Sequence, residues 1–161
     1  MRDIDWKQPA LIGSLIVAVP SLISFFAYPN RFRWFWFWSL LGGIVAARLL
    51  WGRSSRRLTL GDGAKIGFMS GIIGGAIYLV VSAPVFAAWR IDRLIEEILT
   101  MPNPPAGWVE TFLQVKQSFA LRVALSLIMS VIPALIMILF TVLGGLFGVA
   151  IFEKRKEQVI S

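Results

Sequence analysis

Long apolar runs separated by short polar segments dominate the chain. About 20 apolar residues are needed for a helix to cross the hydrocarbon core of a bilayer. Four runs meet this length, and we place membrane spans at about 9–28, 34–51, 64–89 and 123–152. The first run is too long for the apolar part of a signal peptide, so we expect it to be retained. The pattern predicts an all-α polytopic protein with four transmembrane helices in a single membrane domain, 1–161.

The segment between the third and fourth runs, 90–116, has a different pattern. Apolar residues recur there at helical spacing, with charged residues between them: Ile91, Leu94, Ile95, Ile98 and Leu99. This predicts an amphipathic helix, too short and too charged to span, that lies at the membrane interface. Pro102, Pro104 and Pro105 then predict a turn. A helix resumes at Trp108 and leads toward the fourth span.

Basic residues cluster at the ends of the apolar runs. Four spans place the N-terminus, the 51–65 connection and the C-terminus on one side, with ten Lys and Arg there against six on the other. The positive-inside rule then predicts a bacterial inner-membrane protein with cytoplasmic N and C termini, and it makes 90–116 periplasmic. Asp62, before the third run, is expected to be the N-cap of that helix.

Composition agrees with a lipid environment. Hydrophobic residues make up 57% of the chain and charged residues 16%, fewer charges than a soluble domain carries. The net charge of +7 would suggest nucleic acid in a soluble protein. Because the basic residues flank apolar runs, we expect no nucleic-acid partner and assign them to lipid headgroups. Cysteine is absent, which excludes disulfide and thiolate chemistry.

A ladder of glycines is the clearest pattern within the spans. Gly63, Gly67, Gly71 and Gly75 are spaced by four and form one smooth stripe on a helix. Because lipid gives little hydrophobic drive between helices, close backbone approach supplies much of their attraction. Gly144 and Gly148 repeat the spacing in the last run. We expect these glycines to pack the bundle; the alternative is that the stripe docks another subunit or another copy.

Aromatic and basic residues form candidate interfacial anchors. Five consecutive aromatics open the second run, among them Trp34, Trp36 and Trp38. Trp is enriched where a span meets the interface, so we expect these residues to be interfacial anchors. The alternative is that the aromatic rings form a stacking surface for a lipid, quinone or pigment. The remaining candidate anchors are the basic residues Arg56, Arg57, Lys154, Arg155 and Lys156.

Residues that could carry chemistry are sparse. The cores of the four predicted spans contain no Asp, Glu, Lys, Arg or His, which argues against ion-coupled transport and proton relays. Histidine is absent from the whole chain, which removes imidazole ligation and the usual general base. Glu96 and Glu97 are adjacent and diverge on a helix. We therefore expect no enzyme activity, no catalytic residues, no metal and no cofactor.

The stretch Leu60-Gly-Asp-Gly-Ala-Lys-Ile-Gly-Phe-Met-Ser-Gly and the ending Leu-Gly-Gly-Leu-Phe-Gly-Val-Ala-Ile-Phe-Glu-Lys-Arg-Lys carry a resemblance. With the proline-containing amphipathic loop, they resemble a group of small bacterial four-span proteins of unknown function. The resemblance implies four spans in an inner membrane and adds no activity. We expect a non-enzymatic accessory, scaffold or assembly subunit, in a homo-oligomer or a membrane-protein complex. A small oligomeric transporter or channel-like protein without ion-coupling charges is the alternative.

Overall fold

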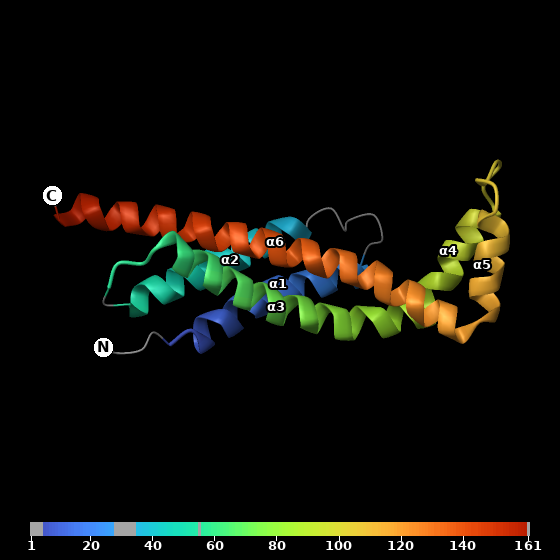
Figure 1. The fold of residues 1–161 in the computed structure, drawn as a ribbon, viewed down its shortest axis with the longest axis horizontal. Coiled ribbons are helices and arrows are strands. Elements are labelled where there is room, and N and C mark those ends of the chain that lie inside the picture. The colour runs from blue at the N-terminus through green and yellow to red at the C-terminus, as the bar shows by residue number, and fades with distance from the viewer. Residues whose placement is uncertain (1–4, 28–34, 55, 161) are drawn as a thin grey trace. The chain divides into compact units, whose positions relative to one another are not determined.

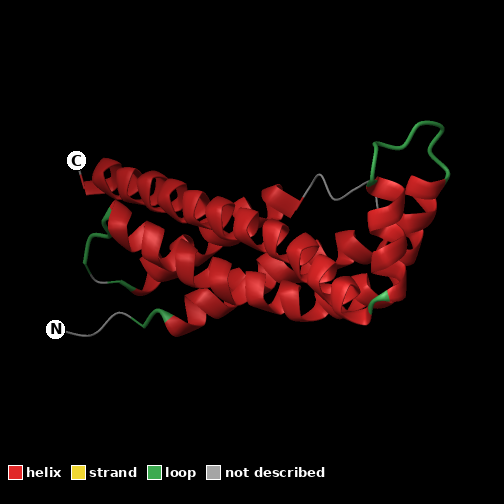
Figure 2. Cartoon of the chain, turned by 45° about the vertical axis from the view of Figure 1, so that its right-hand side comes forward, coloured by secondary structure: helices red, strands yellow, loops and turns green. Residues whose placement is uncertain are grey.

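The computed structural model describes residues 5–27, 35–54 and 56–160, and the elements within these ranges are helices without strands (Figures 1 and 2). The helices are α1 (Lys7–Ala27), α2 (Phe35–Arg53), α3 (Leu60–Val85), the π-helical turn η2 (Phe86–Arg90), α4 (Ile91–Leu99), α5 (Trp108–Gln117) and α6 (Phe119–Ile160). Contacts divide the chain into two compact units. The first unit is Met1–Tyr78 with Pro133–Ser161, and the second unit is Leu79–Ile132.

Three helical segments in the described chain are long and apolar enough to cross a membrane. They are Lys7–Phe26, Leu60–Leu99 and Phe119–Lys154. The second predicted span, which forms α2, is not among these candidates in the described part of the chain. The all-helical prediction is confirmed, with three candidate spans rather than the four expected.

The predicted change from the third span to the amphipathic helix falls within a continuous helical segment. We expected a span ending near Trp89 and a separate interfacial helix. Instead, α3, η2 and α4 follow one another without a loop. Pro84 lacks an N–H and removes one α-helical hydrogen bond, and the wider π-turn begins two residues later. The predicted turn over the three prolines is confirmed, since Met101–Gly107 contains no helix.

The start of α3 also differs from the prediction, because Asp62 lies inside the helix and Thr59 precedes it. The Asp62 backbone N–H donates to the Thr59 hydroxyl at 3.2 Å, and the Thr59 N–H donates to the Asp62 carboxylate at 2.8 Å. These reciprocal bonds form a capping box, with Thr59 as the N-cap and Asp62 as its third-position partner. Asp62 therefore caps the helix from within its first turn.

The first unit buries small residues beside a few large ones such as Leu50, Ile66 and Tyr78, and it leaves many large apolar residues exposed. In Figure 1, α1, α2, the first part of α3 and the last part of α6 lie side by side. On α1 the buried side chains include Ala10, Ser14, Val17, Ala18, Ser21 and Phe25, whereas Leu11, Leu15, Val19 and Ile23 are about half exposed or more. Large apolar side chains exposed along a whole helix face are typical of helices whose solvent is lipid.

The second unit contains a helical hairpin with a conventional core. Helices α4 and α5 lie side by side (Figure 2). Ile91, Ile95 and Val115 are buried between them, and Phe86, Phe112 and Leu125 pack against this cluster. The predicted apolar face of α4 therefore packs on α5 and the start of α6, while Arg93, Glu96 and Glu97 are exposed.

Candidate functional site

The glycine ladder on α3 faces α6 of the same chain. A Cβ atom added to Gly63 would lie 2.6 Å from the Gly145 carbonyl oxygen, and one added to Gly71 would lie 2.9 Å from the Ile138 Cα. A Cβ on Gly67 would collide with the Thr141 carbonyl oxygen. Gly75 is looser, at 3.4 Å from the Ala134 carbonyl oxygen. The two backbones thus approach so closely that three of these four positions exclude any side chain.

The opposite side of α6 meets α2 in the same way. A Cβ on Gly144 would collide with the Leu40 carbonyl oxygen, and one on Gly148 would lie 2.7 Å from the Ala47 Cβ. Helix α1 completes the arrangement, since a Cβ on Gly13 would lie 2.8 Å from the Ala46 Cβ of α2. The space left by these glycines is filled by helices of the same chain.

Hydroxyl side chains accompany the glycines at the buried faces. Ser21 donates to the Val17 carbonyl oxygen at 2.6 Å, and Thr141 donates to the Met137 carbonyl oxygen at 2.6 Å. Each bond stays within its own helix, so the hydroxyl is satisfied without a partner helix. Ser21 and Thr141 therefore lie in the interior with their hydroxyls satisfied, whereas the buried Ser70 hydroxyl has no hydrogen-bond partner among the described residues.

The predicted anchors differ in their surroundings. Trp34 lies outside the described residues. Trp36 is 41% exposed and its ring centroid lies 5.9 Å from that of Phe140, while Trp38 is half-buried. Arg56 pairs with Asp62 at 2.9 Å, and Arg57 is exposed. Lys154 is exposed on α6, whereas the side chains of Arg155 and Lys156 lie outside the described set.

A second group of cation and aromatic pairs was missed by the sequence reasoning. The Arg48 guanidinium lies 4.4 Å from the ring centroid of Trp51 and 5.3 Å from that of Phe152. The Lys65 ammonium lies 4.8 Å from the Trp6 ring centroid. Cation–π contacts of this kind hold long basic side chains beside apolar helices. The spacing of Arg48 and Trp51, three residues apart on one helix, was the available signal.

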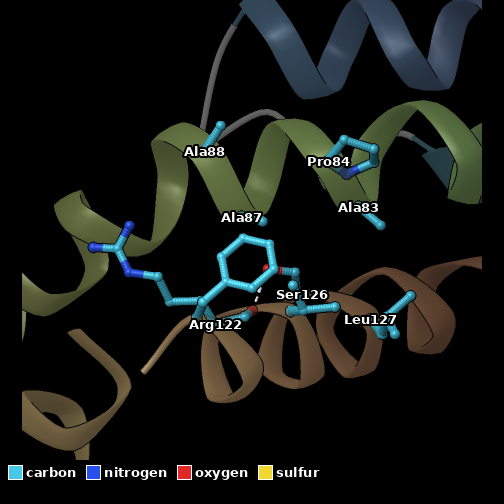
Figure 3. A pocket seen from close by; sticks show the side chains of 9 residues that line it. Ala83, Pro84, Ala87, Ala88, Arg122, Ser126 and Leu127 are labelled. Carbon is cyan, nitrogen blue, oxygen red and sulfur yellow. Dashed lines mark hydrogen bonds between the residues drawn. The ribbon is translucent and has the colours of Figure 1, made fainter. Parts of the chain in front are cut away.

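A cavity of about 510 Å³ lies in the second unit, between the end of α3 with η2 and the first turns of α6. Figure 3 shows Ala83, Pro84, Ala87 and Ala88 on one wall, and Arg122, Ser126 and Leu127 on the other. Phe119 and Val123 complete the lining. Small alanines and the π-turn on the α3 side leave room that the α6 side chains do not fill. Its size lies in the range of small-molecule sites.

Two polar residues line this cavity. The Ser126 hydroxyl donates to the Arg122 carbonyl oxygen at 2.6 Å, the bond dashed in Figure 3, so that donor is already used. Arg122 forms an ion pair with Asp92 of α4 through its Nη2 atom. Its Nε atom is buried and has no hydrogen-bond partner among the described residues. The cavity is thus apolar with one guanidinium donor unsatisfied.

The described residues place no three metal-ligating side chains from the set His, Cys, Asp and Glu close together. Arg122 and Asp92 are drawn together from segments thirty positions apart, which sequence reasoning did not anticipate. Arg122 of this pair lines the cavity. Comparisons of the chain with protein-family models, with curated proteins and with solved structures find no match.

Proposed function

We propose that the protein spans the bacterial inner membrane four times, with α2 as the span that mean hydropathy alone does not select. Its 19 residues give a helix of about 28 Å, close to the thickness of the hydrocarbon core. The buried glycine contacts of α2 with both α1 and α6 support this placement, because its two neighbours are themselves candidate spans. Both termini are then cytoplasmic, on the side richer in Lys and Arg.

The proposed role is that of a non-enzymatic accessory, scaffold or assembly subunit that offers helix surfaces to partners in the membrane. The observation that carries it is the set of large apolar side chains exposed on the helices of the first unit. Glycines and hydroxyls are used between helices of the chain, so large apolar side chains such as Leu135 and Leu139 form the outward faces. Partner contact would therefore use these outward faces and not the glycine stripe.

Purification in a mild detergent tests this role, with the native membrane as the starting material. A stable complex with a different membrane protein supports a scaffold or assembly subunit. Leu135→Ser or Leu139→Ser on the outward face of α6 is expected to weaken such a complex. Gly61→Ala, in the exposed first turn of α3, is the matched control and should leave it intact.

The contrary result is a discrete homo-oligomer that conducts solute in liposomes. Such a result would favour the small transporter or channel-like protein instead. Loss of a cellular phenotype on replacing Glu96 or Glu110, with the protein still folded, would contradict the non-enzymatic assignment.

A further inference from the structure

The cavity of the second unit combines three features that fit one class of ligand. Seven of its nine lining residues are apolar, and they come from two candidate membrane spans. Figure 3 places the Arg122 guanidinium at the end nearer Ala88, while Ala83 and Leu127 lie toward the other end. We propose that this cavity is a phospholipid site in which an acyl chain occupies the apolar part and the phosphodiester accepts hydrogen bonds from Arg122. The proposal rests on the membrane placement proposed above.

The guanidinium has donors to spare for a phosphate. Arginine carries five N–H donors in a planar fork, and only Nη2 is used by Asp92. The Nε atom is buried and has no hydrogen-bond partner among the described residues, whereas the side chain as a whole is 22% exposed. A ligand would therefore meet the guanidinium through the remaining N–H groups of its two Nη atoms. A phosphate oxygen is a strong acceptor for a guanidinium, and Asp92 holds the side chain in place from the other side.

The residues around the cavity are of the types found at the depth of the lipid headgroups. Trp89 is 64% exposed, and the Arg93 guanidinium lies 5.5 Å from its ring centroid. Phe119, which lines the cavity, is 81% exposed. Exposed aromatic and basic residues at the end of an apolar helix are typical of the membrane interface. A phosphodiester at Arg122 would therefore lie level with the headgroups, with its acyl chain beside Ser126 and Leu127.

Native mass spectrometry of the purified full chain tests the proposal. Phosphatidylglycerol and diacylglycerol with the same acyl chains are titrated in parallel, since only the first has a phosphate. Wild type is expected to retain one phosphatidylglycerol and to bind diacylglycerol about tenfold more weakly or worse, the loss expected for a charge-assisted hydrogen bond. Equal retention of the two lipids would overturn the phosphate contact.

Two variants test separately what the space of the cavity and the donors of the guanidinium contribute to lipid retention. Ala87→Leu fills the cavity without altering the ion pair and should abolish retention. Asp92→Asn/Arg122→Met removes the donors without leaving an unpaired charge and should bring phosphatidylglycerol down to the level of diacylglycerol. Ala124→Leu, on the exposed side of α6, is the matched control and should retain the lipid.

Three outcomes would contradict the site. They are retention by Ala87→Leu equal to that of wild type, loss in Ala124→Leu, and a lipid-free dimer that buries the cavity. Recovery of the protein from cells without detergent would overturn the membrane placement itself. That result is measured before any lipid is added, so failure of the placement and failure of the lipid site are distinguished.

Discussion

The two compact units reach their packing by opposite means. In the first unit, glycines such as Gly67 and Gly144 bring helix backbones into contact, and large apolar side chains face outward. In the second unit, the α4–α5 hairpin buries Ile91 and Ile95 as a soluble domain would, and a cavity lies beside η2. The difference shows that close backbone contact orders the helices of the first unit, whereas burial of large apolar side chains orders the α4–α5 hairpin. The proposed membrane placement accounts for it if lipid surrounds the first unit and water reaches the hairpin.

The largest expected effect lies in the hairpin core. Ile95→Ala removes a side chain that is 1% exposed, and a substitution of this kind costs about 2–5 kcal/mol. Because the contacts of Ile95 are with α5, hydrogen exchange should accelerate in α4 and α5 while the first unit stays protected. Leu99→Ala, at an exposed position of the same helix, is the control and should change exchange little. Uniform acceleration across both units would remove the distinction between them.

In the first unit, Gly67→Ala is expected to lower the stability by less than Ile95→Ala does in the second unit. The new Cβ collides with a backbone carbonyl of α6, so the helices must separate, at a cost of about 1–3 kcal/mol. Gly61→Ala meets only the Thr59 hydroxyl at 3.5 Å and should be neutral or stabilising by up to about 1 kcal/mol. Detergent unfolding followed by tryptophan fluorescence measures both. A Gly67→Ala protein as stable as wild type would contradict close packing of α3 on α6.

Glu153 provides a third test, because it joins α6 to the connection before α3. Its carboxylate accepts a hydrogen bond from the Leu58 backbone N–H at 3.0 Å. Glu153→Ala should cost about 1 kcal/mol through the unmet N–H, and Glu153→Gln should recover most of the loss because the amide oxygen also accepts. Limited proteolysis near Ser54 reports the release of this connection. Equal cleavage of Glu153→Ala and wild type would argue against the contact.

The smallest expected effect is that of the Arg122–Asp92 pair on stability. The Arg122 side chain is 22% exposed and that of Asp92 is 45% exposed, so a coupling energy of about 0.2–1 kcal/mol is expected. A double-mutant cycle with Asp92→Asn and Arg122→Gln measures it by thermal unfolding in detergent. A coupling well above this range would mean that the pair is a main structural element of the second unit.

The sequence predicts the helices well because their signals are local. The apolar runs, the amphipathic spacing of Ile91 to Leu99 and the prolines after Met101 each depend on near neighbours along the chain. The continuity of α3 with α4 was missed because Pro84 is followed by a π-helical turn that continues the helix. Asp62 was taken for the N-cap because Asp is among the residues preferred there, whereas the structure uses Thr59, three residues before it.

Packing between helices could be predicted only in part. The spacing of Gly63, Gly67 and Gly71 shows that one face of α3 is smooth, but not which helix covers it. The structure supplies the partner, since all three face α6. The cavity could not be anticipated, because Ala87 and Arg122 come together only when two helices pack. No local pattern distinguishes an alanine that lines a cavity from one that fills a core.

The central claim, four spans with α2 among them, is tested most directly by single-cysteine labelling. The natural chain has no cysteine, so each variant reports one position. In intact spheroplasts, a membrane-impermeant maleimide should label Asn103→Cys but should label Asp5→Cys, Arg56→Cys and Lys154→Cys only after lysis. Labelling of Asp5→Cys and Arg56→Cys from opposite sides would show that α2 does not cross the membrane, and would contradict the account.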